Sequence, residues 1–168
     1  MQAIADKEFA TAMEYLIPEF FDIFPKQEMI NIMEETFTNP LMVFKIKESV
    51  IQEVAEIEKE EEKYYSKLSY DQELEMKMND DSQETEAEKK LRIEDEKGFF
   101  NQSFGENNVK YNEETGFFNI KVKEQAIGVS QNGTSDWKFI VIQKGQMGIV
   151  KKLIPERILA VYEIEWFW

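Results

Sequence analysis

Alternating acidic residues are the feature of this 168-residue sequence with the most obvious chemical capacity. Asp71, Glu73 and Glu75 occupy every second position, and paired carboxylates can act as general acid and base or bind a hard cation. Lys67 and Lys77 share this parity, so we interpret the set as a solvated charge ladder on one face of a strand. The chain has no histidine and no cysteine, which removes the usual general base, the usual zinc ligands and the Ser-His-Asp constellation. We therefore expect no catalytic residue, no metal and no cofactor, and an enzyme is the less favoured interpretation.

A second set of residues has the composition of a pocket lining. It consists of Tyr64, Tyr70, Gln72 and Trp137. Tyr70 and Gln72 share one face of the same predicted strand, and a buried glutamine needs hydrogen-bond partners, which a ligand or the protein can supply. Apolar side chains at this spacing also form ordinary packed cores. Both interpretations, a ligand pocket and a filled core, remain open at this point.

Two loops resemble ligand-binding motifs only superficially. Residues 79–84 are rich in acidic and amide side chains but lack the ligand spacing and central glycine of a calcium loop. Residues 145–148 have two glycines ahead of a predicted helix but lack the lysine and spacing of a phosphate-binding loop. We interpret both segments as plain connections.

The charge distribution indicates which partners the chain favours. The formal net charge is −14, with the acidic excess in the first 96 residues. Such a field repels phosphate backbones, which argues against nucleic acid. It favours either solubility, as a solvated acidic face, or a basic protein partner. The acidic residues expected on the partner surface are Glu60, Glu61, Glu62, Asp80, Asp81 and Glu84.

The C-terminal aromatic residues Trp166, Phe167 and Trp168 form a second candidate contact. Aromatic side chains this dense are costly to expose, so something is expected to cover them. Docking on the protein's own sheet is one solution, and a homodimer or partner contact is the alternative. The N-terminus lacks a basic segment followed by an apolar run, and no stretch of about 18 apolar residues exists, so we expect a cytoplasmic protein without membrane association.

Periodicity predicts one α+β domain over residues 1–168. Asp6 is the expected N-cap of a first helix that Pro18 kinks or splits, and Pro25 opens a second helix. From Tyr64 to Met78 apolar and polar residues alternate, which predicts one long strand whose even-numbered side chains are the more buried. The other predicted strands are 42–48, 50–57, 108–111, 117–123, 125–131, 135–142 and 161–168, with Asn132-Gly133 as a hairpin turn. Further helices are expected over 85–104, with Gly105 as C-cap, over 146–153 and, as a short turn, from Pro155.

This order of elements resembles the nuclear transport factor 2-like, or cystatin-like, α+β cone. The resemblance covers most of residues 6–159 as a pattern. Two segments, Glu14 to Lys26 and Asp136 to Pro155, are similar to stretches in small uncharacterised bacterial proteins. It implies N-terminal helices packed on a strongly curved antiparallel sheet. The predicted order of elements differs from that of the family in two respects. It has two helices before the main sheet where the family has three, and it has a helix at 146–159.

These observations favour a non-enzymatic acidic interaction protein, in its most concrete form an immunity or inhibitor protein that covers a basic partner. Immunity proteins with this frame are known in bacteria, and this part of the expectation rests on the resemblance. The alternative is a small-ligand-binding domain or a pocket enzyme on the same fold. A filled core would favour the first, and a pocket that holds buried polar groups would favour the second.

Overall fold

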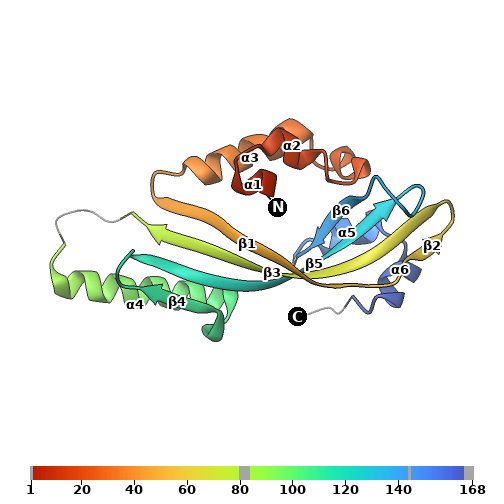
Figure 1. Cartoon of the computed structure of the whole chain (residues 1–168). Helices are drawn as coiled ribbons and strands as arrows, with labels where there is room; N and C mark the ends of the chain where they lie inside the picture. The colour runs from red at the N-terminus through yellow and green to blue at the C-terminus, as the bar shows by residue number, and fades with distance from the viewer. Residues whose placement is uncertain (1, 80–83, 144, 165–168) are drawn as a thin grey trace.

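The computed structural model describes residues 2–79, 84–143 and 145–164 of the chain. It is an α+β protein with six α-helices, two 3-10 helices and an open six-stranded antiparallel sheet in the described residues. Along one half of the sheet the strand order is β1-β3-β5-β4, and towards the other end β2 pairs with β3 and β6 pairs with β5 (Figure 1). The strands are β1 (Met42–Val54), β2 (Glu58–Glu60), β3 (Lys63–Met78), β4 (Val109–Asn112), β5 (Phe117–Ser130) and β6 (Lys138–Ile142).

The long strands β3 and β5 form the spine of the sheet. The strand predicted from Tyr64 to Met78 is confirmed. Residues 117–123 and 125–131, predicted as two strands, are one continuous strand because β3 is long enough to pair with β5 from Phe118 to Ser130. Strand β1 likewise joins the two shorter strands predicted over 42–48 and 50–57. Two bulges in its pairing with β3 shift which residues of β1 face each side of the sheet.

Cross-strand register sorts the side chains into two faces. We call the face with the even-numbered residues of β3 and β5 the neutral face, and the opposite one the charged face. Four of the five buried side chains of β3 belong to the neutral face, as predicted: Ser66, Tyr70, Gln72 and Leu74. The fifth, Tyr65, is buried on the charged face near one end of the strand.

Helix α4 (Glu86–Phe104) covers one end of the neutral face. Thr85 and Glu88 form a capping box at its start, and Gly105 follows its end with a φ of 92°, a conformation that glycine adopts without strain. Phe100 is fully buried and packs against Phe118 of β5, with ring centroids 4.9 Å apart. This contact anchors the first of two separate cores.

The second core lies at the other end of the sheet, on the charged face. Helices α5 (Met147–Leu153) and α6 (Glu156–Val161) and the 3-10 helix η1 (Pro18–Asp22) pack there with Tyr65 and Ile127. The predicted last strand, 161–168, is wrong for residues 161–164, because Val161 ends α6 and Tyr162 starts a turn. The Tyr162 hydroxyl lies 2.6 Å from the carbonyl oxygen of Tyr65, which fixes this turn to β3. Trp166, Phe167 and Trp168 lie outside the described residues.

The N-terminal residues form a helical layer beside the long strands (Figure 1). The helix expected after Asp6, which Pro18 kinks or splits, is divided into α2 (Phe9–Met13) and η1, with η1 beginning at Pro18. Helix α1 (Gln2–Ala5) precedes Asp6, and α3 (Lys26–Thr38) follows. Lys7 has a φ of 60°, which breaks the helix between α1 and α2, so Asp6 follows a helix rather than capping one. Phe37 of α3 packs edge to face against Phe44, a neutral-face residue of β1, with centroids 5.1 Å apart.

The hairpin at Asn132-Gly133 is wider than predicted. Strand β5 ends at Ser130 and β6 begins at Lys138, so residues 131–137 form the loop and the strand predicted over 135–142 is shorter. The Asn132 side-chain oxygen accepts hydrogen bonds from the backbone amides of Thr134 and Ser135, both at 2.8 Å. This asparagine stabilises the loop by local capping.

Candidate ligand site

Polar side chains interrupt the neutral face at the middle of the sheet. Two neighbouring cross-strand rows lie there, Ser49–Gln72–Val122 and Ile51–Tyr70–Glu124, each contributed by β1, β3 and β5. Opposite side chains in such a row stand about 4.5–5.5 Å apart at Cβ, so these two rows form one continuous patch. On one side lies the α4 core, and on the other side lies an apolar row that includes Leu68 and Ala126.

Gln72 is the most unusual member of the patch. The residue is 7% exposed, yet its amide nitrogen has no hydrogen-bond partner among the described residues. The buried hydroxyl oxygen of Ser49, the neighbour of Gln72 in the same row, has no partner in the described ranges either. A buried polar group without a partner destabilises a protein by about 1–3 kcal/mol. Two such groups in adjacent positions therefore lower the stability of the folded protein considerably.

Tyr70 and Glu124 form the polar pair of the second row. Burial, with a smaller contribution from Glu124, raises the pKa of Tyr70 to about 12. Burial also raises the pKa of the Glu124 carboxyl above its ordinary value. Within the described residues, Glu124 has no hydrogen bond or ion pair through its side chain. A carboxylate that is partly desolvated and unpaired is typical of functional sites.

The register shows how isolated this carboxylate is. Among the paired residues on the neutral face of β1, β3, β4, β5 and β6, Glu124 is the only Asp, Glu, Lys or Arg. The charged face, by contrast, has lysines and acids at most positions along the centre of β3 and β5. The patch therefore contains one acidic group, that of Glu124, in an otherwise uncharged surface.

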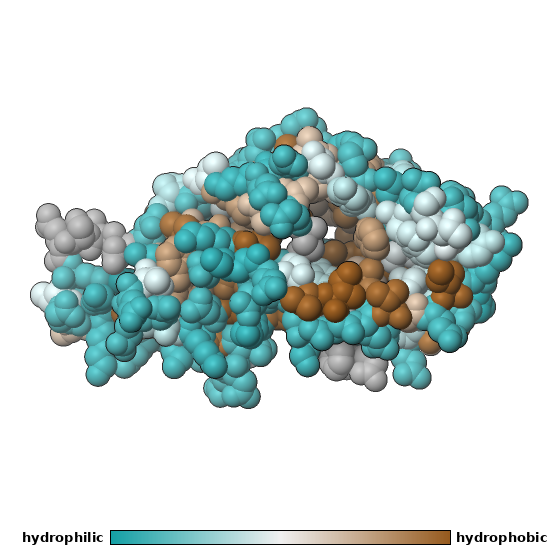
Figure 2. All heavy atoms as spheres, viewed as in Figure 1, coloured by the Kyte–Doolittle hydropathy of each residue, from teal (hydrophilic) through white to brown (hydrophobic). Residues whose placement is uncertain are grey.

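Apolar side chains next to the patch remain exposed. Ile51 and Val54, both on the neutral face of the edge strand β1, are each 63% exposed. Figure 2 shows the surface hollowed between the N-terminal helices and the strands, with hydrophobic side chains gathered along the strands beside it. The site thus combines polar groups in need of partners with apolar surface in need of cover.

The predicted pocket residues divide into two groups. Tyr70 and Gln72 lie together in the patch, whereas Tyr64 is six residues away along β3, about 20 Å. Tyr64 packs against Gly133, where a Cβ atom would stand 2.8 Å from its ring. Trp137 packs over Gly128, where a Cβ atom would stand 3.1 Å from its ring. Tyr64 and Trp137 therefore support the hairpin end of the sheet rather than the patch.

Sequence reasoning missed Ser49 and Glu124. The sequence held a signal for Glu124, because the even-numbered residues around it in β5 are apolar and Glu124 occupies a position of that series. The apolar residues are Phe118, Ile120, Val122 and Ala126. Ser49 was hidden by the bulge between Ile46 and Ser49, which changes the parity of β1.

The carboxylate ladder is on the charged face. Gln52 donates a hydrogen bond to Asp71 at 3.1 Å, and Lys121 forms an ion pair with Glu73 at 2.5 Å. Lys45 and Lys47 lie 3.5 and 3.6 Å from the oxygens of Glu75. In the part of the chain that the structure describes, no three acidic groups gather as a metal site requires. The arrangement is that of a neutralised surface ladder.

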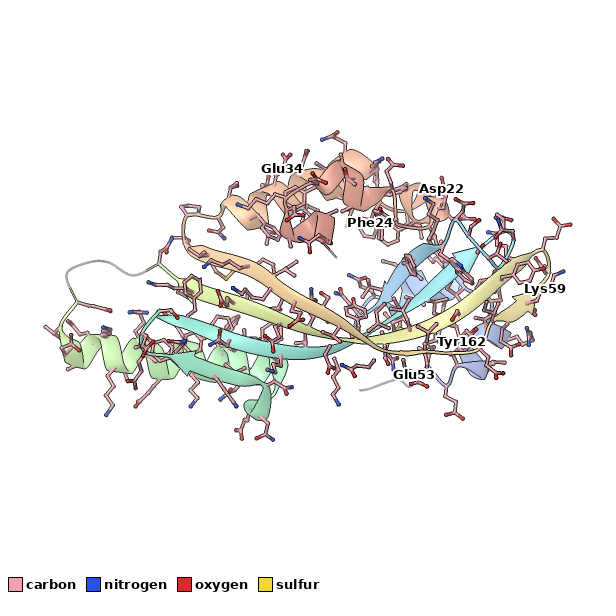
Figure 3. All side chains as sticks on the ribbon, viewed as in Figure 1. Asp22, Phe24, Glu34, Glu53, Lys59 and Tyr162 are labelled. Carbon is pink, nitrogen blue, oxygen red and sulfur yellow. The ribbon has the colours of Figure 1, made fainter. Side chains whose placement is uncertain are left out.

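The acidic residues predicted for a partner surface are spread along the molecule. Glu60, Glu61 and Glu62 lie at the β2–β3 turn, the end that Lys59 marks in Figure 3. Glu84 follows the opposite end of β3, a strand about 50 Å long. Arg157 forms an ion pair with Glu60, and Arg92 forms one with Glu84 at 2.6 Å. Glu60 and Glu84 therefore belong to separate, partly neutralised surfaces. Asp80 and Asp81 lie outside the described residues.

Comparison of the chain with protein-family models, with curated proteins and with solved structures finds no match. Each helix in the described ranges is too short or too polar to cross a bilayer.

Proposed function

We propose that the protein binds a small amphipathic molecule on its neutral face. The polar head of the ligand contacts Gln72 and Tyr70, and its apolar body lies along Ile51 and Leu68. The observation that carries this proposal is the buried amide of Gln72, whose nitrogen has no partner among the described residues. Of the two functions considered from the sequence, the buried polar groups on the neutral face support ligand binding.

The energetics support the same conclusion. An unpaired buried amide destabilises the free protein, and a ligand that supplies the missing hydrogen bond recovers that free energy on binding. Covering apolar surface contributes about 25 cal/mol for each Å² removed from water. Exposed Ile51 and Val54 offer such surface directly beside the polar groups. Natural binding sites commonly retain this kind of local instability because function requires it.

The nuclear transport factor 2-like cone remains part of the proposal as the finer description of the fold. An open antiparallel sheet that follows N-terminal helices along the chain supports it. The cytoplasmic location expected from the sequence also remains a prediction.

Titration with octanol, a neutral amphipathic probe, tests the proposal. Isothermal calorimetry is expected to give saturable one-site binding to the wild-type protein. Ile51→Asp places a charge on the apolar part of the site and is expected to abolish binding. The residue is largely exposed, so the fold tolerates the change. Ile57→Asp is the matched control, because Ile57 is 51% exposed but lies beyond the end of β1. Equal affinity of the wild-type protein and both variants, or no saturable binding, contradicts the proposal.

Capture of a basic protein is the second candidate, and the net charge of −14 favours it. Glu61 and Glu62 are exposed at the β2–β3 turn and form no ion pair among the described residues. Exposed charges of this kind accelerate association more than they add affinity. A homodimer through Trp166, Phe167 and Trp168 remains a prediction.

A further inference from the structure

We propose that the polar head of the ligand is an organic ammonium group and that Glu124 is its counter-ion. This inference rests on the proposed function and names the chemical class that the neutral face takes. It comes from the position of one carboxylate among neutral neighbours.

Glu124 lacks a charged partner on the neutral face. Glu124 is the only Asp, Glu, Lys or Arg among the paired positions on the neutral face of β1, β3, β4, β5 and β6. No described residue forms an ion pair with it. Partly buried charges are normally paired, because desolvation of an isolated charge is costly. A ligand cation supplies the partner that the protein lacks.

Several hydrogen-bond acceptors lie close to Glu124 on the neutral face. An ammonium group donates up to three hydrogen bonds and accepts none, so it requires several acceptors close together. Tyr70 is opposite Glu124, and Gln72 is two residues further along β3 on the same face. The oxygens of Tyr70, Gln72 and Ser49 can each accept a hydrogen bond. The Gln72 amide nitrogen and the Ser49 hydroxyl, both in the same patch as Glu124, are buried and have no partner in the described part of the chain.

A ligand with an anionic head group does not fit the charges of this face. A carboxylate or phosphate head would lie against Glu124 with no lysine or arginine on the paired neutral-face positions of these strands to balance it. The whole chain carries a net charge of −14, which concentrates cations and repels anions at the surface. An apolar molecule with a protonated amine fits both the local and the overall field.

Three probes with the same alkyl chain test the inference: octylammonium, octanol and octanoate, each titrated calorimetrically at neutral pH and low ionic strength. We expect octylammonium to bind the wild-type protein at least about tenfold more tightly than octanol, since a charge-assisted contact adds that much affinity. We expect octanoate to bind most weakly. Glu124→Gln should remove this preference and reduce octylammonium affinity to about that of octanol for the wild-type protein.

Glu53→Gln is the matched control variant. Glu53 lies on the charged face of β1, is exposed, and forms no ion pair among the described residues (Figure 3). The substitution changes the net charge by the same amount, so it should preserve the preference for octylammonium. Equal binding of octylammonium and octanol, or equal losses in Glu53→Gln and Glu124→Gln, overturns the ammonium inference and leaves the proposed function intact. Failure of all three probes to bind overturns both.

Discussion

Replacement of Gln72 by leucine separates a ligand-binding residue from a structural one. If the Gln72 amide serves a ligand, the free protein gains from its removal, because the unpaired nitrogen is buried in a residue that is only 7% exposed. Leucine has a similar size, and its neighbours on the neutral face, Leu74 and Val122, are apolar. Removal of one unsatisfied buried group recovers about 1–3 kcal/mol. We therefore expect Gln72→Leu to increase the free energy of unfolding by about 1–2 kcal/mol.

Urea denaturation followed by tryptophan fluorescence, together with thermal melting, measures this change. For a chain of this size, 1 kcal/mol corresponds to about 2–4 °C in Tm. The matched control is Gln52→Leu, since Gln52 is exposed and donates its hydrogen bond to Asp71 on the charged face. A surface substitution of this kind changes stability by no more than about 0.5 kcal/mol. The same Gln72→Leu protein should lose octanol binding.

The reasoning is refuted if Gln72→Leu destabilises the protein by more than about 1 kcal/mol, a typical loss for a satisfied hydrogen bond. That result would mean that the amide has a structural partner. Greater stability with unchanged octanol affinity would assign the cost of the unpaired amide to something other than ligand binding.

Three further predictions concern other parts of the molecule. Burial raises the folded-state pKa of Glu124, so the stability that its protonated form confers is present below the ordinary glutamate pKa and is lost as pH rises through the folded pKa. Glu124→Gln should flatten this decline in stability with pH and raise Tm at neutral pH. An unchanged profile of stability against pH would contradict the prediction. Tyr162→Phe should cost about 1–2 kcal/mol in urea denaturation, since the hydroxyl lies 2.6 and 2.9 Å from the carbonyl oxygens of Tyr65 and Glu56, and a neutral result would show that water replaces it. Glu61→Gln with Glu62→Gln should slow association with polylysine in stopped-flow mixing at low ionic strength and much less at physiological salt; equal slowing at both would rule out electrostatic capture.

Elements with a strong local signal could be predicted from the sequence. The alternation from Tyr64 to Met78 identified β3 and its buried face, and Thr85 and Gly105 bounded α4 correctly. Local rules failed where pairing with a long neighbour decided the outcome. Strand β5 crosses the polar stretch Lys121–Gln125 because β3 supplies a partner for each residue there. At the N-terminus, helical periodicity was present, but the left-handed backbone at Lys7 divided the helix.

The candidate site was predictable only in part. Tyr70 and Gln72 follow from the parity of one strand, which the sequence shows directly. Glu124 and Ser49 join them through register across three strands, and register depends on bulges that no local pattern reveals. Tyr64 shares the parity of Tyr70 yet stands about 20 Å away, because parity fixes the face of a strand and not the position along it.

The central claim is that the middle of the neutral face binds a ligand, and amide NMR spectra recorded during an octanol titration test it most directly. The account predicts saturable shift changes that are largest at Ile51, Tyr70 and Gln72, with Ile51→Asp removing them. Saturable changes confined to the α5–α6 end of the charged face, or no saturable change at any residue, would contradict it.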